Sequence, residues 1–163
     1  MNLNIILEVV KSFVAANNKK YGSSKCLGVK AHRQFTSFSC CAAVYQMVAH
    51  YYGFKVSHLK AIKLTKCYPN GSSLVHVARV LKREHGLSTK SLRTRKQIRN
   101  ALQNGQPVIT HDELSYEHDH AILLVGQTPK GFWLADPVLG QIHWKNENRV
   151  MAAASEFIAV GAP

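Results

Sequence analysis

The stretch Arg33–Gly53, "RQFTSFSCCAAVYQMVAHYYG", passes from polar residues through two adjacent cysteines into an apolar segment. Its apolar residues recur at helical spacing after the cysteines, and glycine is a typical residue just beyond a helix end. We therefore predict a helix that begins at Cys40 and Cys41 and ends at Gly53. Two thiols at this place have four explanations: packing, a metal site, a disulfide, or a nucleophile. The predicted buried face comprises Ala43, Val44, Met47, Val48 and Tyr51.

The chain has four cysteines, at positions 26, 40, 41 and 67. Their spacing matches no disulfide framework of small secreted domains. Cys40 and Cys41 cannot easily bridge each other, because successive side chains of a helix point about 100° apart. The sequence contains no Cys-x-x-Cys pair, which disfavours a thiolate zinc site. We expect a reduced protein without a metal or cofactor.

The 163 residues contain 46% hydrophobic and 18% charged residues, which is typical of a globular protein. We predict one domain over residues 1–163, with residues 1–25 as an amphipathic helical extension that packs on the domain or docks a partner protein. No apolar run reaches the roughly 18 residues that span a bilayer. The extension lacks the basic start of a secretory signal. We expect a cytoplasmic location, or delivery by a secretion system that needs no cleavable signal.

The formal net charge is +12, and no acidic residue lies between Glu8 and Glu84. A basic half favours anionic partners such as nucleic acid or a lipid surface. The cations are scattered, however, with no run and no interleaved aromatic residues. Solubility or weak nonspecific attraction therefore accounts for the charge more simply than a nucleic-acid site.

Helical patterns come first in the chain and short β-rich runs follow after Gly105. Serine and threonine caps precede helices in "NGSSLVHVARVLKREHG" and "TRKQIRNALQNG", and "SHLKAIKL" is a further short helix. The strands are "QPVITH", "HAILLVGQT", "GFWLADP" and "GQIHWK", separated by turn signals. A helix or strand over "VMAAASEFIAVG" closes the chain. This order predicts an α+β fold, with a helical lobe packed on an antiparallel sheet.

Four residues of this pattern suit nucleophilic chemistry at Cys40. A cysteine attacks as the thiolate, which a helix N-terminus and a nearby histidine both favour. His120 opens an apolar strand at the sheet edge, and Asp136 ends the next strand, where a hairpin would bring it beside His120. Gln34 lies six residues before Cys40 and can donate to an oxyanion. Each signal is weak alone, and the joint order is far more specific.

The chain resembles the bacteriocin-processing, double-glycine leader peptidases, a branch of the papain-like cysteine peptidases. The matching stretches run in the family's order from Gln34 to Ile142: "QFTSFSCCAAVYQMVAHYYG", "GSSLVHVARVLKREHGLSTKSL", "LQNGQPVI", "HAILLVG" and "LADPVLGQI". The resemblance implies a papain-like fold and a peptide or protein substrate. It makes Cys40 the nucleophile, His120 the general base, Asp136 the orienting acid and Gln34 the oxyanion donor.

The sequence departs from the family at three points. Cys41 stands where the family usually has glycine, and "THDELSYEHD" is longer than the usual connection. Family members are typically domains of membrane exporters, whereas this chain has no membrane span and no Gly-x-x-x-x-Gly-Lys loop. The resemblance therefore implies either a free processing protease or a delivered effector or toxin that cleaves or deamidates a host or competitor protein. Acyl transfer in place of hydrolysis also stays open. A noncatalytic peptidase-fold module that binds a leader peptide or nucleic acid is the alternative.

An acidic cluster precedes His120, and we expect it to border the cleft and to bind basic residues of a substrate. The cluster comprises Asp112, Glu113, Glu117 and Asp119. His111, His118 and His120, near Asp112 and Asp119, could imitate a metal site. Zinc ligands usually occupy a fixed frame, whereas this segment has the character of a loop. Four other histidines (His50, His58, His76, His85) are expected on helix surfaces.

Overall fold

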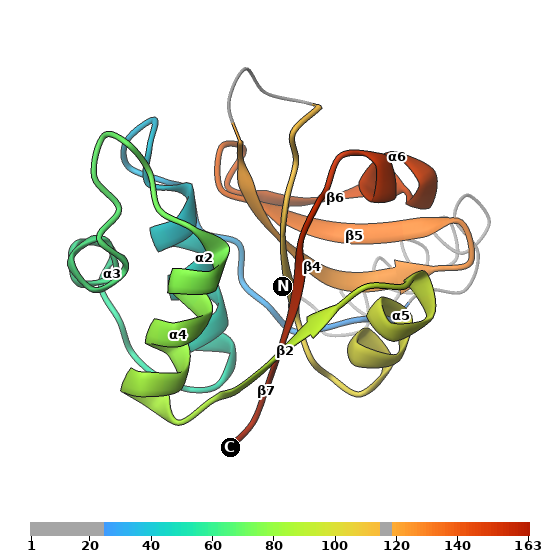
Figure 1. The fold of residues 1–163 in the computed structure, drawn as a ribbon, viewed down its shortest axis with the longest axis horizontal. Helices are drawn as coiled ribbons and strands as arrows, with labels where there is room; N and C mark the ends of the chain where they lie inside the picture. The colour runs from blue at the N-terminus through green and yellow to red at the C-terminus, as the bar shows by residue number, and fades with distance from the viewer. Residues whose placement is uncertain (1–24, 115–118) are drawn as a thin grey trace, which may run out of the picture.

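The computed structural model describes residues 25–114 and 119–163, so the predicted helix over residues 1–25 lies outside the described part except for Lys25, which is in a strand. Three helices form one side of the molecule (Figure 1): α2 (Cys40–Tyr51), α3 (His58–Thr65) and α4 (Leu74–His85). Local signals fix their ends. The side chains of Ser57 and Ser73 accept from the backbone N–H three residues on, at the starts of α3 and α4. Gly86 ends α4 in the left-handed conformation.

A seven-stranded antiparallel sheet forms the other side, with the strand order β2-β7-β3-β4-β5-β6 and β1 paired to β4. β4 and β5 form a tight hairpin, as do β5 and β6, because each pair is joined by only a few turn residues. The strands are β1 (Lys25–Cys26), β2 (Ser88–Leu92), β3 (Val108–His111), β4 (Ala121–Thr128), β5 (Gly131–Asp136), β6 (Gln141–Asn146) and β7 (Phe157–Gly161). The predicted α+β class and antiparallel sheet are confirmed.

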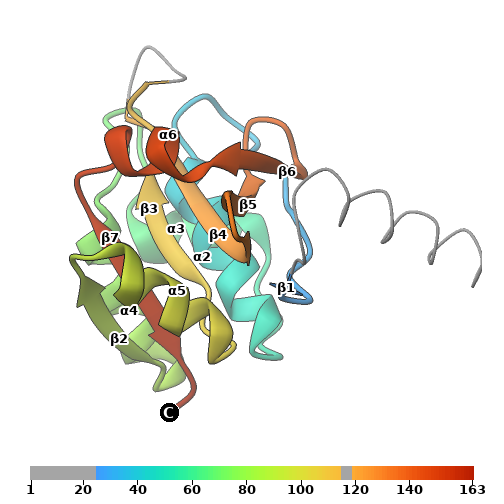
Figure 2. The same ribbon diagram turned by 90° about the vertical axis from the view of Figure 1, so that its right-hand side faces the viewer.

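The order of helices first and strands second is too simple. β2 lies between α4 and α5 (Arg95–Gln103), and α5 packs against the sheet rather than within the helical lobe. The last predicted element is both a helix and a strand, because α6 (Glu147–Ala152) precedes β7. In the turned view, α5 and α6 lie in front of the strands while α2 and α3 lie behind them (Figure 2). Helices therefore cover both faces of the sheet.

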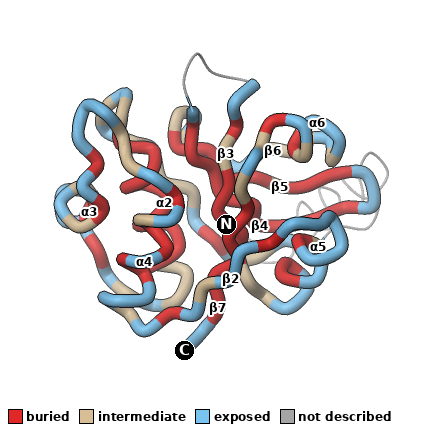
Figure 3. Tube along the Cα trace, in the orientation of Figure 1, coloured by how far each residue is buried: buried red, intermediate tan, exposed pale blue. Residues whose placement is uncertain are grey.

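The core consists of two apolar clusters, one on each face of the sheet. Every residue of β4 is buried, because its side chains alternate between the two faces of the sheet and an apolar cluster covers each face. Leu123 faces α2 and belongs to the cluster of Val44 and Met47, whereas Leu124 belongs to that of Ile98 on α5. Figure 3 shows this burial running through α2 and the central strands, with the exposed residues at the periphery.

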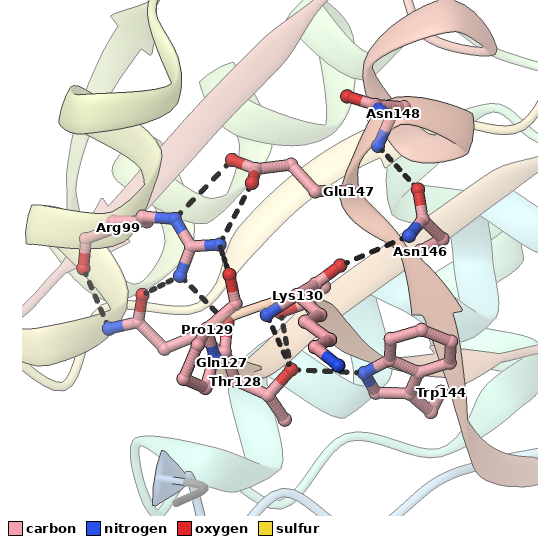
Figure 4. A network of polar contacts seen from close by, with 10 residues as sticks. Arg99, Gln127, Thr128, Pro129, Lys130, Trp144, Asn146, Glu147 and Asn148 are labelled. Atoms are coloured by element: carbon pink, nitrogen blue, oxygen red, sulfur yellow. Dashed lines mark hydrogen bonds and ion pairs between the residues drawn. The ribbon is translucent and has the colours of Figure 1, made fainter. Parts of the chain in front are cut away.

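A polar network fastens α5 and α6 to the β4–β5 hairpin (Figure 4). The guanidinium of Arg99 donates to both carboxylate oxygens of Glu147, at 3.3 and 3.0 Å. It also donates to the side chain of Gln127 at 3.1 Å and to the carbonyl of Thr128 at 2.9 Å. Such a bidentate pair fixes orientation as well as distance. The network lies outside the candidate site and fixes α5 and α6 to the sheet.

Among the described residues, no helix is long and apolar enough to cross a membrane.

Candidate active site

Cys40 is the first residue of α2, at the positive end of the helix, and only 8% of its surface is exposed. Ser39 holds the N-cap position but does not cap with its side chain. Instead its hydroxyl donates to the Thr36 carbonyl and accepts from the Thr36 N–H, which closes a tight turn before the helix. The first N–H groups of α2 have no acceptor within the helix, and those of Cys41 and Ala42 contact the buried sulfur of Cys67.

His120 immediately precedes β4 and contacts Cys40 across the interface between the helical layer and the sheet. Its Nε2 lies 2.9 Å from Oδ1 of Asp136, the last residue of β5. The β4–β5 hairpin explains this contact, because Leu123 is paired with Ala135 and the two strand ends run on side by side. Since Asp136 occupies Nε2, Nδ1 is the nitrogen left for Cys40.

The carboxylate of Asp136 is itself held in place. Its Oδ1 accepts a second hydrogen bond from the backbone N–H of Val138, at 2.8 Å. Asp136 is 2% exposed and His120 is 5% exposed, so water scarcely reaches their contact. An ionic hydrogen bond is stronger in such surroundings than in water. The sheet therefore presents one rigid imidazole to Cys40.

The electrostatics favour a thiolate beside an imidazolium. A hydrogen bond with the Cys41 thiol lowers the pKa of Cys40, burial opposes this, and contacts with His120 and the Ala121 N–H lower it further, to about 4. Burial would lower the pKa of His120, but its hydrogen bonds to Asp136 and Cys40 outweigh burial and raise that pKa to about 9. Between these two values the charged pair is the stable form.

Gln34 lies beside the Asp136 turn. Its backbone N–H donates to the carbonyl of Pro137 at 2.9 Å, and its side-chain Nε2 donates to the carbonyl of Thr36 at 2.8 Å. The amide carries two N–H groups, so one is left after the contact with Thr36. The loop of residues 33–36 is thereby fastened both to the sheet side and to the turn that leads into α2.

A pocket of about 870 Å³ opens beside Cys40. Its wall includes the loop of residues 69–73, which the Cys41 thiol joins to α2 by donating to the Ser72 carbonyl at 3.3 Å. Cys41 has one S–H proton, so this carbonyl and the sulfur of Cys40 compete for it. The lining residues are Ser37, Phe38, Cys40, Cys41, Pro69, Asn70, Gly71, Ser72, Ser73, His111, Asp119 and Ala121.

The acidic cluster is divided by the fold. Asp112 is only 3% exposed and pairs with the ammonium of Lys145 on β6, so its charge is not presented at the cleft as expected. Glu113 is exposed and accepts a hydrogen bond from the hydroxyl of Ser155 at 2.8 Å. Asp119 lines the pocket. Glu117 lies outside the described residues.

Sequence reasoning missed two buried groups that support this region. His58 was expected on a helix surface and is instead 4% exposed, with Nδ1 3.1 Å from Gln46 and Nε2 3.3 Å from Ser39. Cys67 is fully buried and donates to the carbonyl of Phe38 at 2.9 Å. No local pattern signals either contact.

All four cysteines are free thiols. The described ranges contain no group of three or more histidine, cysteine or acidic side chains that could hold a metal.

A cysteine at a helix start, facing a histidine on an antiparallel sheet, defines a papain-like cysteine peptidase. The chain belongs to the Peptidase C39 family, whose sequence profile matches residues 29–151. This confirms the resemblance to the bacteriocin-processing peptidases. No curated protein sequence gives a significant match over the chain.

Solved structures agree with this fold. The peptidase domain of Streptococcus ComA, a bifunctional ABC transporter involved in quorum sensing, superposes with a TM-score of 0.72 at 19% identity, covering 83% of this chain and 99% of that domain. A double-glycine-motif protease from an AMS/PCAT transporter, solved in complex with a leader peptide, gives a TM-score of 0.69 at 18% identity, covering 85% of this chain and 94% of that one. At these identities the likeness concerns the fold.

Proposed function

We propose that this cysteine peptidase cleaves a peptide or protein substrate through a triad of Cys40, His120 and Asp136. The observation that carries the proposal is the position of His120, whose imidazole contacts the Cys40 thiol on one side and lies 2.9 Å from Asp136 on the other. A nucleophile, a base and a group that orients the base meet in a buried site beside an open pocket.

The reaction starts from the charged pair. The Cys40 thiolate attacks the scissile carbonyl carbon, and the carbonyl oxygen becomes an oxyanion that the Cys40 N–H and the Gln34 amide stabilise. The C–N bond then breaks, and the leaving amine takes the proton of His120, which leaves an acyl-enzyme thioester. Neutral His120 next accepts a proton from water, whose oxygen attacks the thioester. The acid product departs and the thiolate–imidazolium pair is restored.

Asp136 and Gln34 hold other groups in place and do not themselves form or break covalent bonds. The carboxylate accepts from Nε2 of His120, which keeps Nδ1 directed at Cys40 and stabilises the imidazolium. Its second hydrogen bond, from Val138, prevents the carboxylate from rotating away. Gln34 is held by Pro137 and Thr36, and its remaining side-chain N–H is the donor that we assign to the oxyanion. Preorganised donors cost little reorganisation during the reaction.

A processing role is the form of this function that the comparisons favour. The double-glycine-motif protease was solved with a leader peptide bound, and ComA carries its peptidase as part of a transporter. We therefore propose that the substrate is a peptide precursor. A delivered effector or toxin would use the same chemistry on a folded protein of another cell, and the substrate distinguishes the two roles.

The test compares Cys40→Ala with Cys26→Ala, a matched change at an exposed cysteine outside the pocket. Each full chain is incubated with a peptide library made from a bacterial proteome, and new peptide termini are counted by mass spectrometry. We expect wild type and Cys26→Ala to give the same termini and Cys40→Ala to give none. Cleavage that survives in Cys40→Ala would refute the proposal.

The noncatalytic alternative makes a different prediction. A binding module for nucleic acid would hold DNA or RNA at low ionic strength and release it as salt rises. Titration of the full chain with a labelled oligonucleotide would detect this binding. Absence of binding at low salt, together with cleavage that depends on Cys40, would exclude the nucleic-acid version.

A further inference from the structure

The described walls of the pocket beside Cys40 contain an acidic residue but no Lys or Arg. The chain has 21 Lys and Arg residues against 9 Asp and Glu, yet no Lys or Arg of residues 25–114 and 119–163 is among the lining residues. Among the residues that the structure describes, Asp119 is the one carboxylate in that lining. A negative wall on a protein of net charge +12 attracts a cation locally while the rest of the surface repels it.

Asp119 lies close to the reacting atoms along the chain and in space. It directly precedes His120, and the next residue, Ala121, donates its N–H to the Cys40 sulfur and also lines the pocket. A substrate whose scissile carbonyl is at Cys40 therefore has a neighbouring side chain within this pocket. At about 870 Å³, the pocket has room for a long side chain.

The opposite wall is fixed and polar. The Cys41 thiol donates to the Ser72 carbonyl at 3.3 Å, and the Ser72 hydroxyl donates to the Thr65 carbonyl at 2.6 Å. Asn70 and Ser73 lie on the same loop and add polar groups to the lining. A cationic side chain between this loop and Asp119 would find hydrogen-bond acceptors on both sides.

The other two described acids of the segment, Asp112 and Glu113, are engaged elsewhere. Asp112 is paired with Lys145, and Glu113 accepts from Ser155 and does not line the pocket. Asp119 is exposed, so its carboxylate is available to a ligand. Of the three described acids of the cluster, Asp119 is therefore the one placed to take the role that the sequence assigned to the cluster.

We infer that this pocket binds a Lys or Arg side chain next to the scissile bond and that Asp119 determines this specificity. The inference rests on the proposed function and deepens it. Substrates of this chain then carry a basic residue at one fixed position beside the cleaved bond. Each such residue gains one charge-assisted hydrogen bond in a partly exposed site.

The test measures residue preference. The peptide-library digest first identifies the position beside the cleaved bond at which Lys and Arg are enriched. Matched synthetic peptides with Lys, norleucine or Glu at that position are then compared by kcat/KM, using wild type, Asp119→Asn, Asp119→Lys and Glu84→Gln. Glu84 is an exposed acid of α4 outside the pocket, so its variant controls for the change in net charge.

We expect wild type to prefer Lys over Glu by about tenfold at low ionic strength, with a smaller ratio at high salt. Asp119→Asn should bring the ratio near one, Asp119→Lys should favour Glu, and Glu84→Gln should leave the ratio unchanged. A ratio cancels any general effect of the substitution on the neighbouring His120. No enrichment of basic residues, or an unchanged ratio in Asp119→Asn, would overturn the inference alone. Absence of any cleavage that depends on Cys40 would overturn the proposed function and the inference with it.

Discussion

The charged pair of Cys40 and His120 makes a sharp prediction about alkylation by iodoacetamide as pH varies. The pKa of Cys40 is lowered to about 4, so its thiolate fraction is nearly constant between pH 5.5 and pH 8. Cys26 is exposed, and burial of part of its thiol raises its pKa. Its thiolate fraction, and with it the labelling rate, should increase roughly tenfold with each pH unit.

The expected rates follow from two opposing effects. At pH 6 an ordinary thiol of pKa about 8.5 is roughly 0.3% thiolate, which favours Cys40 by about 300-fold. A thiolate of low pKa is also less nucleophilic, with a Brønsted coefficient near 0.4–0.5, which costs Cys40 about 100-fold over this pKa difference. The net advantage at pH 6 is only about threefold and reverses at higher pH. The slope against pH is therefore the decisive quantity, and it does not depend on how exposed each sulfur is.

The assay is brief labelling of the full chain at four pH values, followed by digestion and quantification of the labelled cysteine peptides by mass spectrometry. We expect a flat line for Cys40 and a steep line for Cys26. In urea-unfolded chain both should be steep, because the helix N-terminus and the imidazole are gone. In the variant His120→Ala, the Cys40 labelling rate should rise with pH, because the contact with His120 that lowers the pKa of Cys40 is lost. A Cys40 rate that rises in parallel with Cys26 in the folded protein would refute the ion pair.

Three further predictions concern the same structure. The pH profile of kcat/KM should be bell-shaped, because the thiolate is protonated below about pH 4 and the imidazolium needed by the leaving amine is lost above about pH 9; full activity at pH 10 would contradict it. Cys41→Ser keeps a donor to the reactive sulfur and Cys41→Ala does not, so only the alanine variant should shift the alkylation midpoint upward; equal midpoints would show that this donor is unimportant. Arg99→Ala should lower the free energy of unfolding by about 2 kcal/mol, because it leaves the largely buried carboxylate of Glu147 without this partner. Arg83→Ala removes an exposed ion pair and should cost less than about 0.5 kcal/mol. Urea unfolding of both variants measures the difference.

The sequence predicted the elements whose ends depend on local chemistry. Thr94 and Gln97 form a reciprocal capping box at the start of α5, and Ser73 caps α4 as the pattern indicated. Such signals involve residues three positions apart, so a single sequence contains them in full. The helix at Cys40 was also predicted at its observed start, although its cap side chain turns back to the preceding loop.

The sequence did not predict β2, and its composition explains why. The strand "STKSL" is largely exposed at the edge of the sheet and lacks the alternation of a half-buried strand. Its pairing with β7, more than 60 residues away in sequence, makes it a strand. The position of α5 on the sheet follows from the same long-range pairing, because β2 carries the chain out of the helical layer before α5 begins.

Burial of polar residues was equally hidden. Asp112 pairs with Lys145, and His58 meets Ser39 and Gln46. Each contact joins elements that only the tertiary fold brings together. The sequence shows a charged or titratable residue in each case, but the partner that pairs or hydrogen-bonds with it lies on another element. The sequence therefore predicted exposed positions for two side chains that are in fact buried and bonded to neighbouring elements.

The reactive pair itself is a property of the interface between the two layers. Burial alone raises the pKa of Cys40 and lowers that of His120, so each residue in isolation would remain neutral. Hydrogen bonds of Cys40 with the Cys41 thiol and with His120, and of His120 with Asp136, reverse both tendencies. The contact between Cys40 and His120 exists only where the start of α2 meets the start of β4. Val44 of α2 and Leu123 of β4 belong to one apolar cluster, so the packing that joins the layers also sets the distance between sulfur and imidazole. Charge separation in this site is therefore maintained by the hydrophobic core beneath it.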